Sequence, residues 1–166
     1  PVSVDSRVRT LTEFAGAVGI VLSLIFVGME LRHANNLAEA EAVDSINQAY
    51  RELFLGYMQD KESSRLLSEV MTGSLTGIDQ LAPDEVFRVR GFYAAFASNL
   101  EMVWKYMDRG IIEPPQADLY VSDACGIFEA SRDTLTIWHS LRDGYAPEFI
   151  AYVESACSTL RDPASE

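Results

Sequence analysis

The sequence predicts an all-α protein in which one transmembrane helix continues into an amphipathic stalk and then into a small bundle of about five helices. Apolar residues recur at three- and four-residue steps along most of the chain, and no segment alternates convincingly as a strand would. A third observation is an uncharged run near the N-terminus, at 14–29. We therefore expect an N-terminal tail at 1–10, a transmembrane helix at 11–31, an acidic helical domain at 32–160 and a C-terminal tail at 161–166.

The uncharged run is just long enough to cross a membrane when it is extended to both sides. Its 16 residues cover about 24 Å as a helix, whereas the hydrocarbon core of a bilayer is ~30 Å thick. The extended segment 11–31 reaches that length, with Glu13 and Glu30 close enough to its ends to contact headgroups. A helix that is apolar on every side must be buried in protein or in lipid. We favour lipid, because so small a chain has few helices to surround it.

Two other interpretations of this segment stay open, namely a buried core helix and a cleavable signal peptide. Arg7 and Arg9 would form the basic end of a signal peptide, and the stretch LAEAEA offers small residues for cleavage. We expect the segment to be retained, because it is present in the chain.

Small residues on the predicted span suggest a second role for it. Ala15, Gly19 and Ser23 are four residues apart, so they share one helix face. In lipid, such a stripe lets the backbone of another helix approach closely. We predict a helix-packing interface there, for a larger integral membrane complex or for a second copy of the chain. The residues predicted to lie at the membrane interface are Glu13, Glu30, Arg32 and His33.

The next segment should continue the same helix as a rigid stalk, because no Pro or Gly interrupts 29–55. Apolar residues there fall on one helix face. They are Leu37, Ala40, Val43, Ile46, Tyr50, Leu53, Phe54 and Tyr57.

The remaining pattern predicts five further helices, the first of them around 64–71. A loop rich in Gly and Thr at 72–84 ends at Pro83, which begins a helix that should run to Arg109 and stop at Gly110. Another helix should begin after Pro115, and two short ones should occupy 133–141 and 147–160. We predict that Tyr93 and Trp104 belong to the core and that Tyr106 is a partner contact.

The charge is concentrated outside the predicted span. The chain carries a formal charge of −12, while residues 1–32 contain three basic and three acidic side chains and sum to zero. Phosphate backbones and anionic headgroups repel an acidic domain, so nucleic acid is an unlikely partner. The bilayer contact is expected through the span alone.

The two cysteines, Cys125 and Cys157, have neither metal-ligand nor CxxC spacing. We expect them to be small buried thiols, with a single disulfide as the alternative if the domain faces an oxidising compartment.

No catalytic constellation is evident, so we predict a non-enzyme with no cofactor. Glu30 and His33 have the spacing of half a di-iron site, but Thr136 stands three residues before His139, so the second copy is absent. No P-loop, GxGxxG or nucleophile elbow occurs.

The chain resembles a widespread group of uncharacterised bacterial proteins that have one N-terminal apolar helix and a small helical domain. In that group the apolar helix ends in a pattern like Y-L-A-x-Q-I-R-x-N, and here IFVGMELRHAN places Arg32 at the Arg position, with Asn35 displaced by one. The later stretches RGIIEP and FEASRDTLTIWHSLRDGYAPEFIAYV are similar to the group's Gly-Leu-Leu, Trp and Pro-Glu-Phe pattern. The resemblance implies an anchored helical domain and no assigned activity.

These observations favour a membrane-anchored, non-catalytic accessory subunit that docks on a larger integral membrane complex and stabilises it. The alternatives are a soluble or membrane-edge helical regulator that binds a small ligand, and a metal-dependent enzyme. We expect a single-pass protein of the bacterial inner membrane. Arg7 and Arg9, compared with Arg32, favour an external domain. The resembling group favours a cytoplasmic domain, and we predict the cytoplasmic side.

Overall fold

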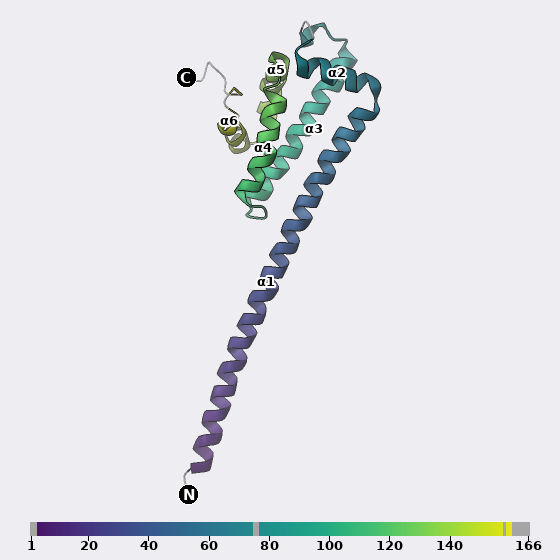
Figure 1. Cartoon of the computed structure of the whole chain (residues 1–166). Coiled ribbons are helices and arrows are strands. Elements are labelled where there is room, and N and C mark those ends of the chain that lie inside the picture. The colour runs from purple at the N-terminus through teal and green to yellow at the C-terminus, as the bar shows by residue number, and fades with distance from the viewer. Residues whose placement is uncertain (1–2, 75–76, 158, 161–166) are drawn as a thin grey trace. The chain divides into compact units, whose positions relative to one another are not determined.

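A computed structural model describes residues 3–74, 77–157 and 159–160, with side chains described from residue 13 onward. These residues form six α-helices and two short 3-10 helices, with no strand among them (Figure 1). The all-α prediction is therefore confirmed. The predicted tail at 161–166 lies outside the described residues.

Helix α1, Ser3–Gln59, contains the apolar segment and the amphipathic segment as one uninterrupted helix, as predicted. It begins inside the range expected to be an N-terminal tail. The chain divides into two compact units within this helix, residues 1–41 and residues 42–166. We call the first the N-terminal unit and the second the body, so the last part of α1 belongs to the body.

Helix α2, Lys61–Thr72, has clear signals at both of its ends. The Asp60 carboxylate accepts a hydrogen bond from the backbone N–H of Ser63 at 3.0 Å, which caps the N-terminus. Gly73 ends the helix with φ at 65°, a left-handed conformation that glycine adopts without steric cost. A 3-10 helix at Ile78–Gln80 follows in the predicted loop.

Helix α3, Pro83–Asp108, runs through the middle of the body. Pro83 occupies its first turn, and the Glu85 carboxylate accepts a hydrogen bond from the backbone N–H of Ala82 at 2.8 Å. The chain turns at Gly110, where φ is 67°. Both ends agree with the prediction. The residues that α3 buries are Val89, Phe92, Tyr93, Phe96, Ala97, Leu100 and Val103.

Three shorter helices complete the body: α4 (Pro114–Phe128), α5 (Arg132–Leu141) and α6 (Pro147–Ala156). A 3-10 turn at Arg142–Gly144 lies between α5 and α6. The Ser131 hydroxyl caps α5 by accepting from the Thr134 N–H at 3.2 Å, and it donates to the Val70 carbonyl at 2.6 Å. This one side chain therefore fixes the start of α5 against the end of α2.

Aromatic rings fill the core of the body. Figure 1 shows α3 between α4 and the last part of α1. The ring centroids of Tyr57 and Phe92 are 4.9 Å apart, and those of Tyr50 and Phe96 are 5.5 Å apart. The prediction that Tyr93 is a core residue is confirmed, since it is completely buried. Trp104 is half-buried and packs against the core.

Cys125 and Cys157 form a disulfide that joins α4 to the end of α6, with their Cα atoms 5.2 Å apart. The expectation of two separate buried thiols is therefore wrong. The two residues are 32 positions apart, so their proximity depends on how α4 packs on α6, and no local spacing reveals it. The disulfide residue Cys157 is extended and ends α6 before the predicted boundary at Leu160.

Candidate functional site

The first candidate site is the apolar part of α1, in the N-terminal unit. Every described side chain from residue 13 to residue 38 is exposed. Phe14 is 68% exposed and Phe26 is 63% exposed, although both are large apolar side chains. By length and composition, this is the one helix among the described residues that could cross a membrane. An exposed apolar surface of this kind requires lipid or another protein to cover it.

The predicted helix-packing residues lie on this surface. Ala15, Gly19 and Ser23 are all exposed. The Ser23 hydroxyl donates to the Gly19 carbonyl at 2.8 Å, so this polar side chain is already satisfied by its own helix. A Cβ atom built on Gly19 would meet no atom within 4 Å. The stripe is therefore open to a partner, and its role in packing stays a prediction.

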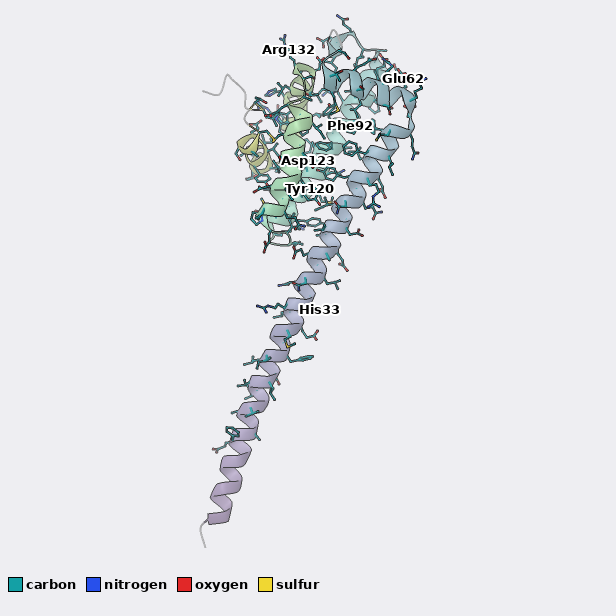
Figure 2. The ribbon with its side chains drawn as sticks, in the orientation of Figure 1. His33, Glu62, Phe92, Tyr120, Asp123 and Arg132 are labelled. Carbon is teal, nitrogen blue, oxygen red and sulfur yellow. A yellow bond between two sulfur atoms is a disulfide. The ribbon has the colours of Figure 1, made fainter. Side chains whose placement is uncertain are left out.

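The predicted membrane-interface residues lie at the two ends of the same apolar surface. Glu13 precedes it, whereas Glu30, Arg32 and His33 follow it, and all four side chains are exposed. Figure 2 shows His33 on α1, beyond the apolar run. Polar side chains at both ends of an apolar helix are typical of a span whose ends reach the headgroup region.

Tyr106, the predicted partner contact, belongs to the body and is half-buried. It packs against a small apolar cluster that includes Ile46, Val103 and Ile112. Most of its ring therefore serves the fold, and a contact with a partner would involve only its exposed edge.

The second candidate site is a groove in the body with a volume of about 550 Å³. We call it the aromatic groove. Its lining residues come from α1, α3 and α4, and they are Asn47, Tyr50, Phe54, Phe96, Tyr120, Ser122, Asp123, Gly126 and Ile127. The Tyr120 hydroxyl donates to the Asn47 side-chain oxygen at 3.1 Å, which connects α4 to α1. Figure 2 labels Tyr120 and Asp123 on α4.

The groove is acidic at its edge and apolar inside. Asp123 is exposed, and Phe96 is completely buried. The Tyr50 hydroxyl is buried and finds no hydrogen-bond partner among the described residues. Burial raises the pKa of Tyr50 well above its usual range, and the nearby Tyr120 and Asp123 raise it further. Tyr50 is therefore neutral at physiological pH, and its ring lines the groove.

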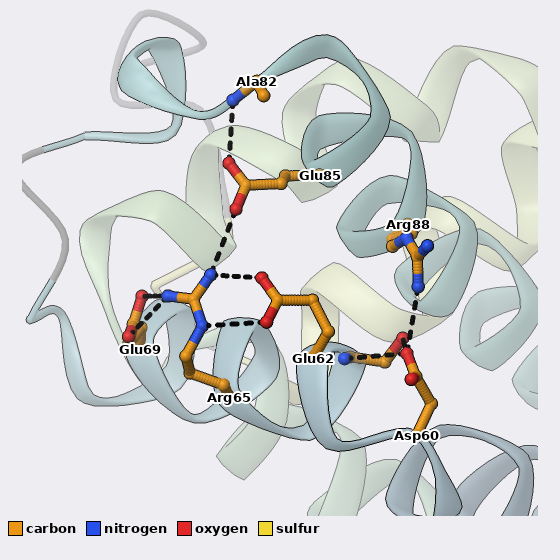
Figure 3. A network of polar contacts seen from close by, with 8 residues as sticks. Asp60, Glu62, Arg65, Glu69, Ala82, Glu85 and Arg88 are labelled. Atoms are coloured by element: carbon orange, nitrogen blue, oxygen red, sulfur yellow. Dashed lines mark hydrogen bonds and ion pairs between the residues drawn. The ribbon is translucent and has the colours of Figure 1, made fainter.

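A network of charged side chains at the corner between α1, α2 and α3 has a structural role (Figure 3). Arg65 pairs with Glu62, with Glu69 at 2.7 Å and with Glu85 at 3.0 Å. Arg88 pairs with Asp60 at 2.9 Å. The cations in this network are paired with carboxylates and half-exposed, so it holds α2 against α3 and offers no unpaired group for chemistry.

The residues weighed for metal binding do not form a cluster. Within the described part of the chain, no group of three or more His, Cys, Asp and Glu side chains could hold a metal ion. Glu30 and His33 lie in the N-terminal unit, whereas His139 is half-buried in the body. The absence of enzymatic activity stays a prediction.

Comparisons of the chain with models of known protein families, with curated proteins and with solved structures found no match. The resemblance to a bacterial group of anchored helical domains therefore stays a prediction.

Proposed function

We propose that this protein is a membrane-anchored, non-catalytic accessory subunit that docks on a larger integral membrane complex and stabilises it. The observation that carries the proposal is the apolar surface of α1, which is exposed around the whole helix from residue 14 to residue 29. Burying this surface in lipid is strongly favourable, since each exposed Leu, Ile or Phe side chain gains about 1.5–3 kcal/mol when it is buried.

The anchor can be tested with one charged residue in the middle of the apolar segment. Val21 is the central residue of 11–31, and lysine there would cost about 2.5–3.5 kcal/mol in a bilayer. The V21K variant should therefore shift from the membrane fraction, washed with carbonate, towards the soluble fraction. The matched control is L37K, at an exposed leucine beyond the apolar run. If the wild-type chain is soluble without detergent, the anchor proposal fails.

Docking through the small-residue face has its own matched pair of variants. Gly19→Ile adds a bulky side chain to the stripe of Ala15, Gly19 and Ser23, where there is open space. Gly28→Ile adds the same side chain about 180° away on the helix, also in open space. After gentle extraction and size separation, only Gly19→Ile should lose co-migrating proteins. Equal loss in both variants, or a wild-type chain that migrates alone, would contradict docking through this face.

We infer that the body faces the oxidising side of the membrane, rather than the cytoplasmic side predicted from the sequence. The supporting feature is the Cys125–Cys157 disulfide, because disulfides persist in oxidising compartments. Arg7 and Arg9 on the N-terminal side of the span favour the same orientation. Protease added to spheroplasts should remove the body. Protection of the body until the membrane is dissolved would refute this orientation.

A further inference from the structure

We propose that the aromatic groove binds a small organic ammonium ion that carries an apolar or aromatic group. This site lies in the body, and its existence does not depend on the anchor or on a docking partner. Three features of the groove support the assignment: its size, its aromatic walls and the sign of its charge.

The size of the groove suits a small molecule. Its volume of about 550 Å³ lies within the range of about 300–1,000 Å³ that is usual for ligand pockets. Gly126 of α4 lies beside this space, and a Cβ atom at that position would meet no atom within 4 Å, so a larger side chain can be introduced there.

The aromatic walls favour a positively charged ligand with an apolar body. Rings of Tyr50 and Phe54 from α1, Phe96 from α3 and Tyr120 from α4 line the groove. The centroids of Tyr50 and Tyr120 are 5.7 Å apart with an interplanar angle of 31°. The faces of such rings attract cations as well as apolar groups. The partly exposed rings of Tyr50, Phe54 and Tyr120 therefore offer apolar contact and favourable electrostatics together.

The charge of the lining selects against anions. No Lys or Arg lines the groove, while Asp123 does. Asp123 is exposed and forms no ion pair among the described residues. A carboxylate beside aromatic faces is the combination that binds an ammonium group by both its charge and its hydrocarbon surface. A neutral apolar ligand would use the rings alone and would not sense Asp123.

Two probes of equal length separate these cases. Phenethylammonium is positively charged at neutral pH, and 2-phenylethanol is its neutral counterpart. Each is titrated into the full chain in maltoside micelles, and binding is followed by the NMR signals of the Gly126 amide and the Asn47 side-chain amide. We expect phenethylammonium to bind more tightly than the alcohol, by about threefold. Equal affinities, or tighter binding of the alcohol, would overturn the proposal.

Three variants locate the binding site. Gly126→Leu should fill the groove and abolish the binding of phenethylammonium, whereas Gly56→Leu, the same change at an exposed position of α1 with open space around it, should leave binding unchanged. Asp123→Asn preserves the shape and should weaken the ammonium by about threefold, with no effect on the alcohol. If Gly126→Leu does not fold, the affinity of Asp123→Asn for phenethylammonium still tests the proposal. Wild-type binding by either Gly126→Leu or Asp123→Asn would refute the site.

Discussion

Breaking the Cys125–Cys157 disulfide should lower the stability of the body substantially. The disulfide closes a loop of 32 residues, and the loss of chain entropy expected for a loop of that length corresponds to about 3.7 kcal/mol at 25 °C. Cys157 is only 1% exposed, so its reduced thiol would stay packed and little apolar burial would be lost. The destabilisation should therefore come mainly from the greater freedom of the unfolded chain. For a body of this size, we expect the melting temperature to fall by about 14 °C.

The assay is thermal unfolding of the full chain in detergent, followed by circular dichroism with and without a phosphine reductant. The control is the double variant Cys125→Ala/Cys157→Ala, which should melt near the reduced wild type and should not respond to the reductant. Thiol titration under denaturing conditions reports the state of the cysteines. An unchanged melting temperature with two free thiols would refute the loop-closure reasoning. Two free thiols before reduction would refute the disulfide itself.

Three further predictions concern single side chains of the body, each checked by the free energy or midpoint of unfolding. Thr134→Val should lower the free energy of unfolding by about 1–3 kcal/mol, because the buried Thr134 hydroxyl donates to the Phe128 carbonyl at 2.7 Å. The control Thr136→Val, at an exposed position, should lower it by less than about 0.5 kcal/mol. Equal losses in the two variants would contradict this. Tyr93→Phe should leave stability unchanged or increase it by up to about 1 kcal/mol, because the buried Tyr93 hydroxyl has no hydrogen-bond partner among the described residues; a clear loss would indicate an ordered water or other partner. The pKa of Asp60 is lowered from 3.8 by hydrogen bonds from the Ser63 side chain and backbone. The contribution of Asp60 to stability is therefore present above pH 3.8 and is lost as the pH falls through the lower pKa of the folded state. Asp60→Asn should make the melting temperature less dependent on pH in this acidic range, and an unchanged dependence would contradict this.

Helix positions followed from signals that are local in the sequence. The absence of Pro and Gly from 29–55 predicted that the apolar and amphipathic segments share one helix, and α1 has that continuity. Pro83 and Gly110 bracketed α3 because one begins helices well and the other permits a left-handed turn. The details of the buried face were less predictable. Ala40 was assigned to the apolar stripe, yet Ala42 is the alanine that is buried.

The candidate sites divide in the same way between local and long-range features. The apolar surface of α1 was evident, since it depends on consecutive residues. The aromatic groove was not predicted, because Tyr50, Phe96 and Tyr120 belong to three helices and each ring also fits an ordinary core position. Asp123 and Gly126 have no sequence signal of their own. The Cys125–Cys157 pairing likewise depends on tertiary packing.

The boundary between the two units within α1 determines where proteolysis can release a folded body. The body begins at residue 42, and Ile46, Tyr50 and Phe54 of α1 contribute to its apolar clusters. A truncation at the end of α1 would remove these side chains, expose the rings of Phe92 and Phe96 and eliminate one wall of the aromatic groove. A protease that cleaves the exposed stretch just before residue 39 would instead release a fragment that retains the complete core. Cleavage just before residue 39 would thus release a folded body, whereas cleavage at the end of α1 would release a body that lacks part of its core.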